Sequence, residues 1–182
     1  TLDVCHDLER VGVGFDLGPS RPEITAADAR RLPMPDASAD FVFMDPPYST
    51  HIRYTEQPEC IGTLDAAGED GGEAYYESMT QVISESARIL RNRRYMALYV
   101  SDSWRKRKGA KGGGNGTFMP IGFELFAIMT RFFKPVDIIA VARGNRKLGR
   151  GNWHKSAEEG NYFLRGFNYL FIMKKHIDDA RR

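Results

Sequence analysis

The sequence predicts an α/β fold built on a mainly parallel sheet with an antiparallel hairpin at one edge. Short apolar runs alternate with segments of helical period, as in doubly wound sheets. The last two β-rich runs, residues 136–141 and 169–173, are joined by a polar segment, which favours an antiparallel pair. With 182 residues and 42% hydrophobic content, the chain is long enough for a buried core, and we expect residues 1–182 to form one domain.

The first part of the chain contains a helical segment and three short strands. Residues 1–10 carry apolar side chains at helical spacing. Three β-rich runs come after them, and the third is an unbroken apolar stretch, typical of a strand that is buried on both faces. An aspartate directly follows each run: Asp16 follows residues 11–15, Asp28 follows residues 24–27 and Asp45 follows residues 41–44.

The middle of the chain combines a long loop with the clearest helix. Residues 49–72 show no apolar period and are dominated by Asp, Glu, Gly and Thr, so we expect a mobile loop with a function. Residues 73–90 place their apolar side chains on one face of a helix, and arginines follow at its negative end. Residues 95–100 predict the next buried strand.

Polar loops dominate the last part of the chain. Residues 101–118 are basic and then glycine-rich, which predicts a flexible segment. Pro120 occupies a first-turn position of a helix that is expected to run to residue 132, and Pro135 prevents its continuation. Residues 143–160 form a second long polar segment, between the two closing strands.

The charge and the rarer residue types exclude several classes of protein. The formal net charge is +2, but basic residues are bunched, as in proteins that bind nucleic acids. Two cysteines are too few for a disulfide framework, and no apolar run approaches the roughly 18 residues of a membrane span. The four histidines lack the spacing of metal ligands. We therefore expect a cytoplasmic protein without a metal site.

The tetrapeptide at residues 45–48 has the chemistry of a catalytic turn. Asp45 comes at the carboxyl end of its strand, where open α/β sheets bind ligands. Pro46 and Pro47 have no backbone N–H and fix the chain direction, so carbonyl oxygens are expected to point out of a rigid turn. A carboxylate and such a carbonyl can hold both hydrogens of an exocyclic amino group and direct its lone pair toward an electrophilic methyl group. Tyr48 adds a ring for base stacking, worth about 1–3 kcal/mol.

Asp45-Pro46-Pro47-Tyr48 after an apolar strand resembles the D/N/S-P-P-Y/F/W motif of S-adenosylmethionine-dependent DNA amino-methyltransferases. These enzymes methylate adenine N6 or cytosine N4. The flanking sequence agrees, because residues 1–4 resemble the family's first helix and residues 12–16 its second strand. Residues 122–143 and 161–174 resemble the family's last helix and last two strands, so the resemblance covers nearly the whole chain. It implies a Rossmann-like class I methyltransferase fold.

The resemblance also implies a cofactor site. Asp16, followed by Leu17, would bind the ribose of S-adenosylmethionine, and Asp28, followed by Ala29, would bind its adenine amino group. The family's glycine-rich cofactor motif and the strand before it are expected directly upstream of Thr1. We therefore expect the sheet to lack its first strand, and the chain by itself to bind the cofactor weakly.

The implied reaction is methyl transfer to a base that has been flipped out of the DNA duplex. Residues 45–48 would hold and stack that base, and no covalent enzyme intermediate is required. Asp rather than Ser at position 45 favours adenine N6. Cytosine N4 remains an alternative, as do an RNA or a protein glutamine substrate and a nucleic-acid-binding module or inactive fragment without catalysis.

DNA is the expected partner, and three loops are the expected contacts: residues 49–72, 101–118 and 143–160. The second and third of these loops combine tryptophan with basic side chains, which suits stacking on bases and pairing with phosphates. The oligomeric state stays open, a homodimer included. The candidate DNA-binding residues are Trp104, Arg105, Lys106, Arg107, Lys108, Arg146, Arg150 and Trp153.

Overall fold

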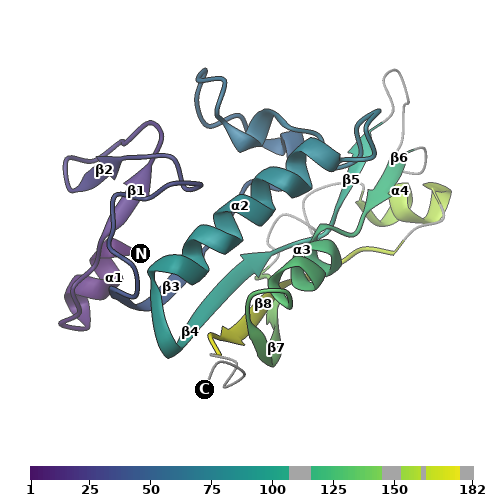
Figure 1. Cartoon of the computed structure of the whole chain (residues 1–182). Helices are drawn as coiled ribbons and strands as arrows, with labels where there is room; N and C mark the ends of the chain where they lie inside the picture. The colour runs from purple at the N-terminus through teal and green to yellow at the C-terminus, as the bar shows by residue number, and fades with distance from the viewer. Residues whose placement is uncertain (107–115, 145–152, 161–162, 177–182) are drawn as a thin grey trace.

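The computed structural model describes residues 1–106, 116–144, 153–160 and 163–176 (Figure 1). Its strands are β1 (Gly14–Asp16), β2 (Ile24–Ala26), β3 (Ala39–Met44), β4 (Leu90–Val100), β5 (Ser103–Lys106), β6 (Gly116–Met119), β7 (Lys134–Ala142) and β8 (Phe167–Lys174). Its α-helices are α1 (Leu2–Asp7), α2 (Glu73–Ile89), α3 (Ile121–Met129) and α4 (Trp153–Gly160), and the short 3-10 helices η1 (Ser49–His51) and η2 (Ile61–Thr63) lie between β3 and α2.

The main sheet has the strand order β3-β4-β8-β7. β3 runs parallel to β4, whereas β8 runs antiparallel to both β4 and β7. A separate parallel pair, β1 and β2, lies beside this sheet, at the left of Figure 1. The predicted fold class is therefore confirmed, and so is the antiparallel pairing of the last two strands, in which β8 is inserted between β4 and the edge strand β7.

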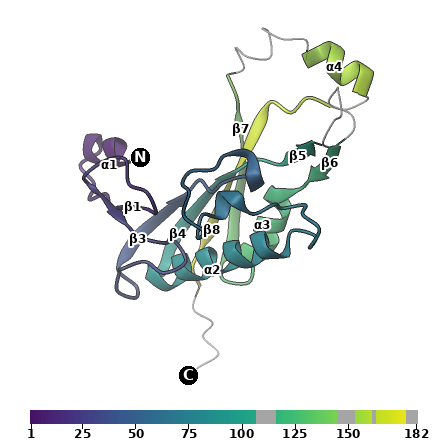
Figure 2. The same ribbon diagram turned by 90° about the horizontal axis from the view of Figure 1, so that it is seen from above.

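The core lies between the main sheet and the helices α2 and α3, which pack on the same face of it (Figures 1 and 2). The helix predicted at residues 73–90 is confirmed as α2. Gly72, at the start of this helix, has a φ of 88°, and an added Cβ would lie 2.4 Å from the Ala66 carbonyl oxygen, so only glycine fits. The Asp70 carboxylate accepts hydrogen bonds from the backbone N–H groups of Gly72 and Ala74, which caps the helix.

The prediction that residues 41–44 are buried on both faces is wrong for the described residues. Val42 and Met44 pack against the core, but Phe41 and Phe43 are 57% and 44% exposed. Side chains alternate along a strand, so these two phenylalanines point to the face opposite α2 and α3. Their neighbour on β4, Tyr95, pairs with Phe41 and is exposed as well.

The two parallel pairs do not join into one sheet. Among the described residues, the outer edge of β3 pairs with no strand, and β1 pairs only with β2. β1 is also shorter than predicted, because Val11 is 98% exposed and the strand begins only at Gly14.

The three polar loops contain more regular structure than the sequence predicts. Residues 49–72 form η1 and η2 and bury Ser49, Cys60 and Ala66, so the expected mobile loop is in fact packed. The described ends of the 101–118 segment form the antiparallel hairpin β5–β6. Part of the 143–160 segment forms α4. No helix in the described part of the chain is both long and apolar enough to cross a membrane.

Candidate active site

The carboxyl ends of β1, β2 and β3 bring the three predicted aspartates to one side of the molecule. Asp16 ends β1, and its carbonyl accepts the N–H of Ala27, which places Asp28 beside it. Tyr54 lies within electrostatic range of both Asp45 and Asp16. Burial raises the pKa of Tyr54 first, and the Asp45 and Asp16 carboxylates both raise it further, so the phenol lies near both of them. Sequence analysis did not single out Tyr54.

Residues 45–48 are predicted to be catalytic, and we call them the catalytic turn for that reason; the turn contains carboxylate and carbonyl oxygens that can accept hydrogen bonds. The Asp45 carboxylate is exposed and accepts a 2.9 Å hydrogen bond from the Tyr48 hydroxyl. The Pro47 carbonyl is already engaged, because the Tyr75 hydroxyl donates to it at 2.7 Å. Pro46 is buried, and no backbone N–H group of the described residues donates to its carbonyl. The pair that remains for a substrate amino group is therefore the Asp45 carboxylate with the Pro46 carbonyl.

Tyr48 lies across the Asp45 carboxylate rather than projecting away from it. Burial raises the pKa of the Tyr48 phenol, and its hydrogen bond to Asp45 raises it further, while Arg143 acts in the opposite direction. The phenol therefore stays protonated at neutral pH and keeps donating to Asp45. A base that uses the Asp45 carboxylate has to compete with this hydrogen bond.

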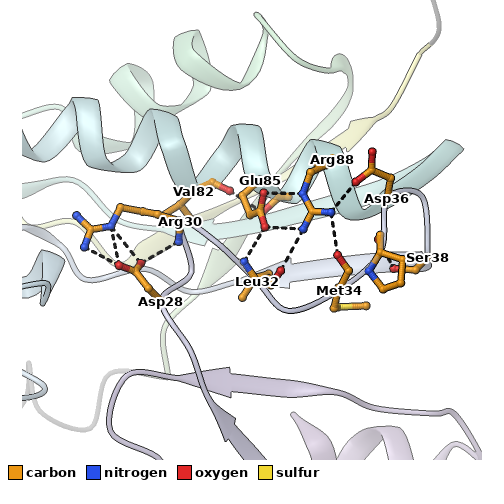
Figure 3. Close-up of polar contacts among 11 residues, drawn as sticks. Asp28, Arg30, Leu32, Met34, Asp36, Ser38, Val82, Glu85 and Arg88 are labelled. Carbon is orange, nitrogen blue, oxygen red and sulfur yellow. Dashed lines mark hydrogen bonds and ion pairs between the residues drawn. The ribbon is translucent and has the colours of Figure 1, made fainter.

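The predicted cofactor residues Asp16 and Asp28 differ in how far their carboxylate oxygens are already engaged in hydrogen bonds. Asp16 is exposed, and one of its oxygens, Oδ1, accepts the Gly18 N–H at 2.8 Å. Asp28 is clamped by Arg30, whose Nε and Nη2 lie 2.9 and 2.6 Å from Asp28 Oδ2 (Figure 3). Burial raises the pKa of Asp28, but the hydrogen bonds from Arg30 outweigh it and hold that pKa below its usual range.

The loop of residues 49–72 is fastened across the strand ends. Gln57 Nε2 donates to the carbonyl of Leu17 at 3.1 Å, and Arg30 Nη2 donates to the carbonyl of Glu59 at 3.2 Å. At its other side the loop holds the hairpin β5–β6, because Arg105 Nε lies 2.9 Å from Asp65 Oδ2. The loop thus connects the predicted cofactor residues with the predicted DNA-binding hairpin.

A second clamp fixes the segment that leads from Asp28 to β3 (Figure 3). Glu85 on α2 accepts the N–H of Leu32 at 2.6 Å, and Arg88 donates to the carbonyls of Leu32 and Met34 and to Asp36. The hydrogen bond from Arg88 is the main cause that lowers the pKa of Glu85. The Glu85–Arg88 ion pair therefore fixes the segment between β2 and β3 to helix α2.

The predicted DNA-binding residues are only partly described. Trp104 is 36% exposed on β5 and packs against Phe118 of β6, with ring centroids 5.3 Å apart. The Arg165 guanidinium lies 4.8 Å from the Phe118 ring centre, which adds a cation to this aromatic pair. Arg105 is committed to Asp65 and to the carbonyl of Ala67.

The other predicted DNA-binding residues fall mostly outside the described part of the chain. Lys106 ends β5 and Trp153 begins α4, but only their backbones are described. Arg107, Lys108, Arg146 and Arg150 lie outside the described residues.

A polar cluster at the carboxyl end of β4 was not predicted. The buried Asp102 accepts the Gly122 N–H at 2.9 Å and the Tyr169 hydroxyl at 3.0 Å. Arg143 donates to Ser101 Oγ at 2.9 Å, and its charge also reaches Tyr48. This cluster therefore borders the catalytic turn. Its partners are far apart in sequence, so no local pattern marked it. No group of three metal-ligating side chains occurs among the described residues.

Comparison with known proteins supports the fold. No family model and no curated protein matches the sequence. A protein of Thermus thermophilus, described provisionally as a DNA modification methylase and solved with S-adenosyl-L-methionine, has a TM-score of 0.56 and 17% identity. The match covers 85% of this chain and 56% of that one, so the chain spans little more than half of the Thermus protein.

Two archaeal structures match over a larger share of their length. A protein of Pyrococcus horikoshii has a TM-score of 0.53 and 13% identity, over 95% of this chain and 75% of that one. A Haloferax volcanii complex between a methyltransferase activator and a provisionally assigned methyltransferase gives a TM-score of 0.53 and 13% identity, over 97% of this chain and 77% of the matched one. At such identities the likeness concerns the fold alone. The chain has the α/β fold of class I S-adenosylmethionine-dependent methyltransferases.

Proposed function

We propose that this chain transfers a methyl group from S-adenosylmethionine to the N6 amino group of an adenine in DNA. The observation that carries the proposal is the catalytic turn at the end of β3, where an exposed carboxylate is followed by a carbonyl to which no described backbone N–H donates. Two acceptors match the two hydrogens of an exocyclic amino group. The fold of the chain, shared with methyltransferases, supports the same chemistry.

The residues at the ends of β1 and β2 fit a nucleoside cofactor. Asp16 keeps Oδ2 for a ribose hydroxyl, because only Oδ1 is used by Gly18. Leu17 is half-buried beside it, and the exposed Ala29 follows Asp28. The Asp28 carboxylate can accept a hydrogen bond from the adenine amino group only while it also pairs with Arg30. When bound, S-adenosylmethionine supplies a methyl group on a positively charged sulfur.

The protein residues then act on the base. Asp45 and the Pro46 carbonyl accept the two amino hydrogens and hold the nitrogen lone pair outside the plane of the base, toward the methyl group. Tyr48 leaves Asp45 and stacks on the flipped base. As the nitrogen gains the methyl group, the bond from that carbon to the cofactor sulfur would break and its electron pair would stay on the sulfur. The nitrogen would lose one proton, which the Asp45 carboxylate would accept and pass to water.

A DNA substrate is supported by the hairpin β5–β6. Trp104, Phe118 and Arg165 combine flat rings with a cation, which suits a nucleic acid. The Thermus protein with the same fold is described provisionally as a DNA modification methylase. Cytosine N4 offers the same pair of amino hydrogens and is the second candidate.

The test is methyl transfer to DNA by the natural full-length protein. Unmethylated genomic DNA is incubated with tritium-labelled S-adenosylmethionine, digested to nucleosides and separated by chromatography with mass detection. We expect the label in N6-methyladenine. Label in N4-methylcytosine selects the second candidate. Label that appears only with RNA or protein as acceptor, or no transfer at all, refutes the proposal.

A further inference from the structure

The catalytic turn is held by a tyrosine from a different element of the fold. Tyr75, in the first turn of α2, is fully buried, and its hydroxyl donates the 2.7 Å hydrogen bond to the Pro47 carbonyl. Its ring packs edge-on against Tyr76, with centroids 5.1 Å apart. Burial raises the pKa of the Tyr75 phenol, with a smaller opposite effect from the Ser49 backbone N–H, so the hydroxyl keeps its proton at neutral pH.

The turn has few other ways to be held. Pro46 and Pro47 have no N–H group, so other residues can hold the turn only through hydrogen bonds to its carbonyls or through the residues next to it. Ser49 is such a neighbour: it is buried and has a φ of 60°, a conformation that is unfavourable for residues other than glycine. Its hydroxyl accepts the Ala66 N–H at 2.9 Å and donates to Asp65 at 3.3 Å, which keeps it in this conformation.

The hydrogen bonds made by Tyr75 and Ser49 restrict the directions of the two remaining acceptors, the Asp45 carboxylate and the Pro46 carbonyl. The ring of Pro47 fixes its φ, so the direction of the Pro47 carbonyl is coupled to the orientation of the preceding peptide, which carries the Pro46 carbonyl. With the Pro47 carbonyl held toward α2 by Tyr75, the peptide that carries the Pro46 carbonyl is held as well. Ser49 fixes the other end of the turn.

We propose that Tyr75 is a positioning residue for methyl transfer, and that its hydroxyl sets the direction in which the Pro46 carbonyl and the Asp45 carboxylate meet the substrate amino group. Tyr75 itself touches no substrate. This inference rests on the proposed function, and it assigns to a core side chain a role beyond stability.

The test compares Tyr75→Phe with Tyr76→Phe, because both changes remove one hydroxyl from the same turn of the same helix. Each full-length variant is assayed with labelled S-adenosylmethionine and DNA, with kcat and both KM values measured. We expect Tyr75→Phe to lower kcat by about tenfold, as for a hydrogen bond that acts in the transition state, with KM for cofactor and DNA unchanged. Tyr76→Phe should keep the wild-type kcat. Tm should fall by no more than about 4 °C in either variant.

The outcomes separate this inference from the proposed function. An unmodified protein that does not methylate DNA removes the proposed function, and the inference with it. An active unmodified protein with equal kcat in the two variants refutes the inference alone. A loss of cofactor affinity in parallel with kcat also refutes it, because it indicates general loosening. If Tyr75→Phe does not fold, Ser49→Ala decides: a similar loss of kcat supports the positioning role, and an unchanged kcat overturns it.

Discussion

Replacement of Asp45 by alanine is expected to abolish methyl transfer while leaving the fold intact. The Asp45 side chain is exposed, and in the described residues it accepts a hydrogen bond from the Tyr48 hydroxyl. Loss of one such hydrogen bond lowers the free energy of unfolding by about 0.5–1.5 kcal/mol. In the proposed reaction the carboxylate is one of two preorganised contacts to the amino group, and removal of one contact of this kind lowers kcat by about 10²–10³.

The assay is incorporation of labelled methyl groups into DNA, together with thermal unfolding and titration of S-adenosylmethionine. Asp45→Asn should be nearly as damaging, because the amide keeps one acceptor oxygen but adds a donor facing the amino group. Asp40→Ala is the matched control. Asp40 belongs to the same strand, but its partners are Arg91 and Arg94, so kcat should not change. An Asp45→Ala protein with a kcat within about tenfold of the wild type would show that this carboxylate does not act on the amino group.

Three further predictions concern the base, the DNA and the acid stability. Tyr48→Phe should change kcat little, because stacking needs only the ring, whereas Tyr48→Ala should weaken the capture of the flipped base by about 1–3 kcal/mol in kcat/KM. Replacement of residues 106–108 by alanine should weaken DNA binding about equally for all sequences and reduce the slope of log affinity against log salt by up to about 3. Glu85→Gln should lower Tm by several degrees at pH 7. Since the folded-state pKa of Glu85 is lowered, this difference should hold above the ordinary glutamate pKa of 4.5 and vanish as pH falls through the folded-state value.

Each of these predictions has a control or a contrary result. For Tyr48, a Phe variant as inactive as the Ala variant would show that the hydroxyl, rather than the ring, is required. For the basic residues, an unchanged salt slope would mean that the charges are merely solvated. For Glu85, the exposed Glu77 on the same helix provides the matched Glu→Gln change, which should leave Tm unaltered. A Glu85→Gln effect that persists at about pH 2 would contradict the assigned ion pair.

The prediction from sequence succeeded where the information is local. The period of α2 and the strand runs that end in Asp16, Asp28 and Asp45 follow from residues close together along the chain, and the structure contains these elements. The rigidity of the catalytic turn is also local, since it comes from two consecutive prolines. Its assignment as catalytic stays a prediction until the Asp45 variants are assayed.

The sequence by itself determined the elements outside the three polar loops, their order and the residues at the strand ends, because backbone propensity and apolar period act over a few residues. Only the tertiary structure decided which of those groups are free. The pairing of Arg30 with Asp28 is one example, because either side chain alone has many possible partners. The same holds for Tyr75, whose phenol meets the Pro47 carbonyl only after α2 has packed against the sheet, and for Phe41, whose exposure depends on which face the helices cover. The Tyr75 contact and the exposure of Phe41 depend on segments that the folded core brings together, and no pattern along the chain encodes them.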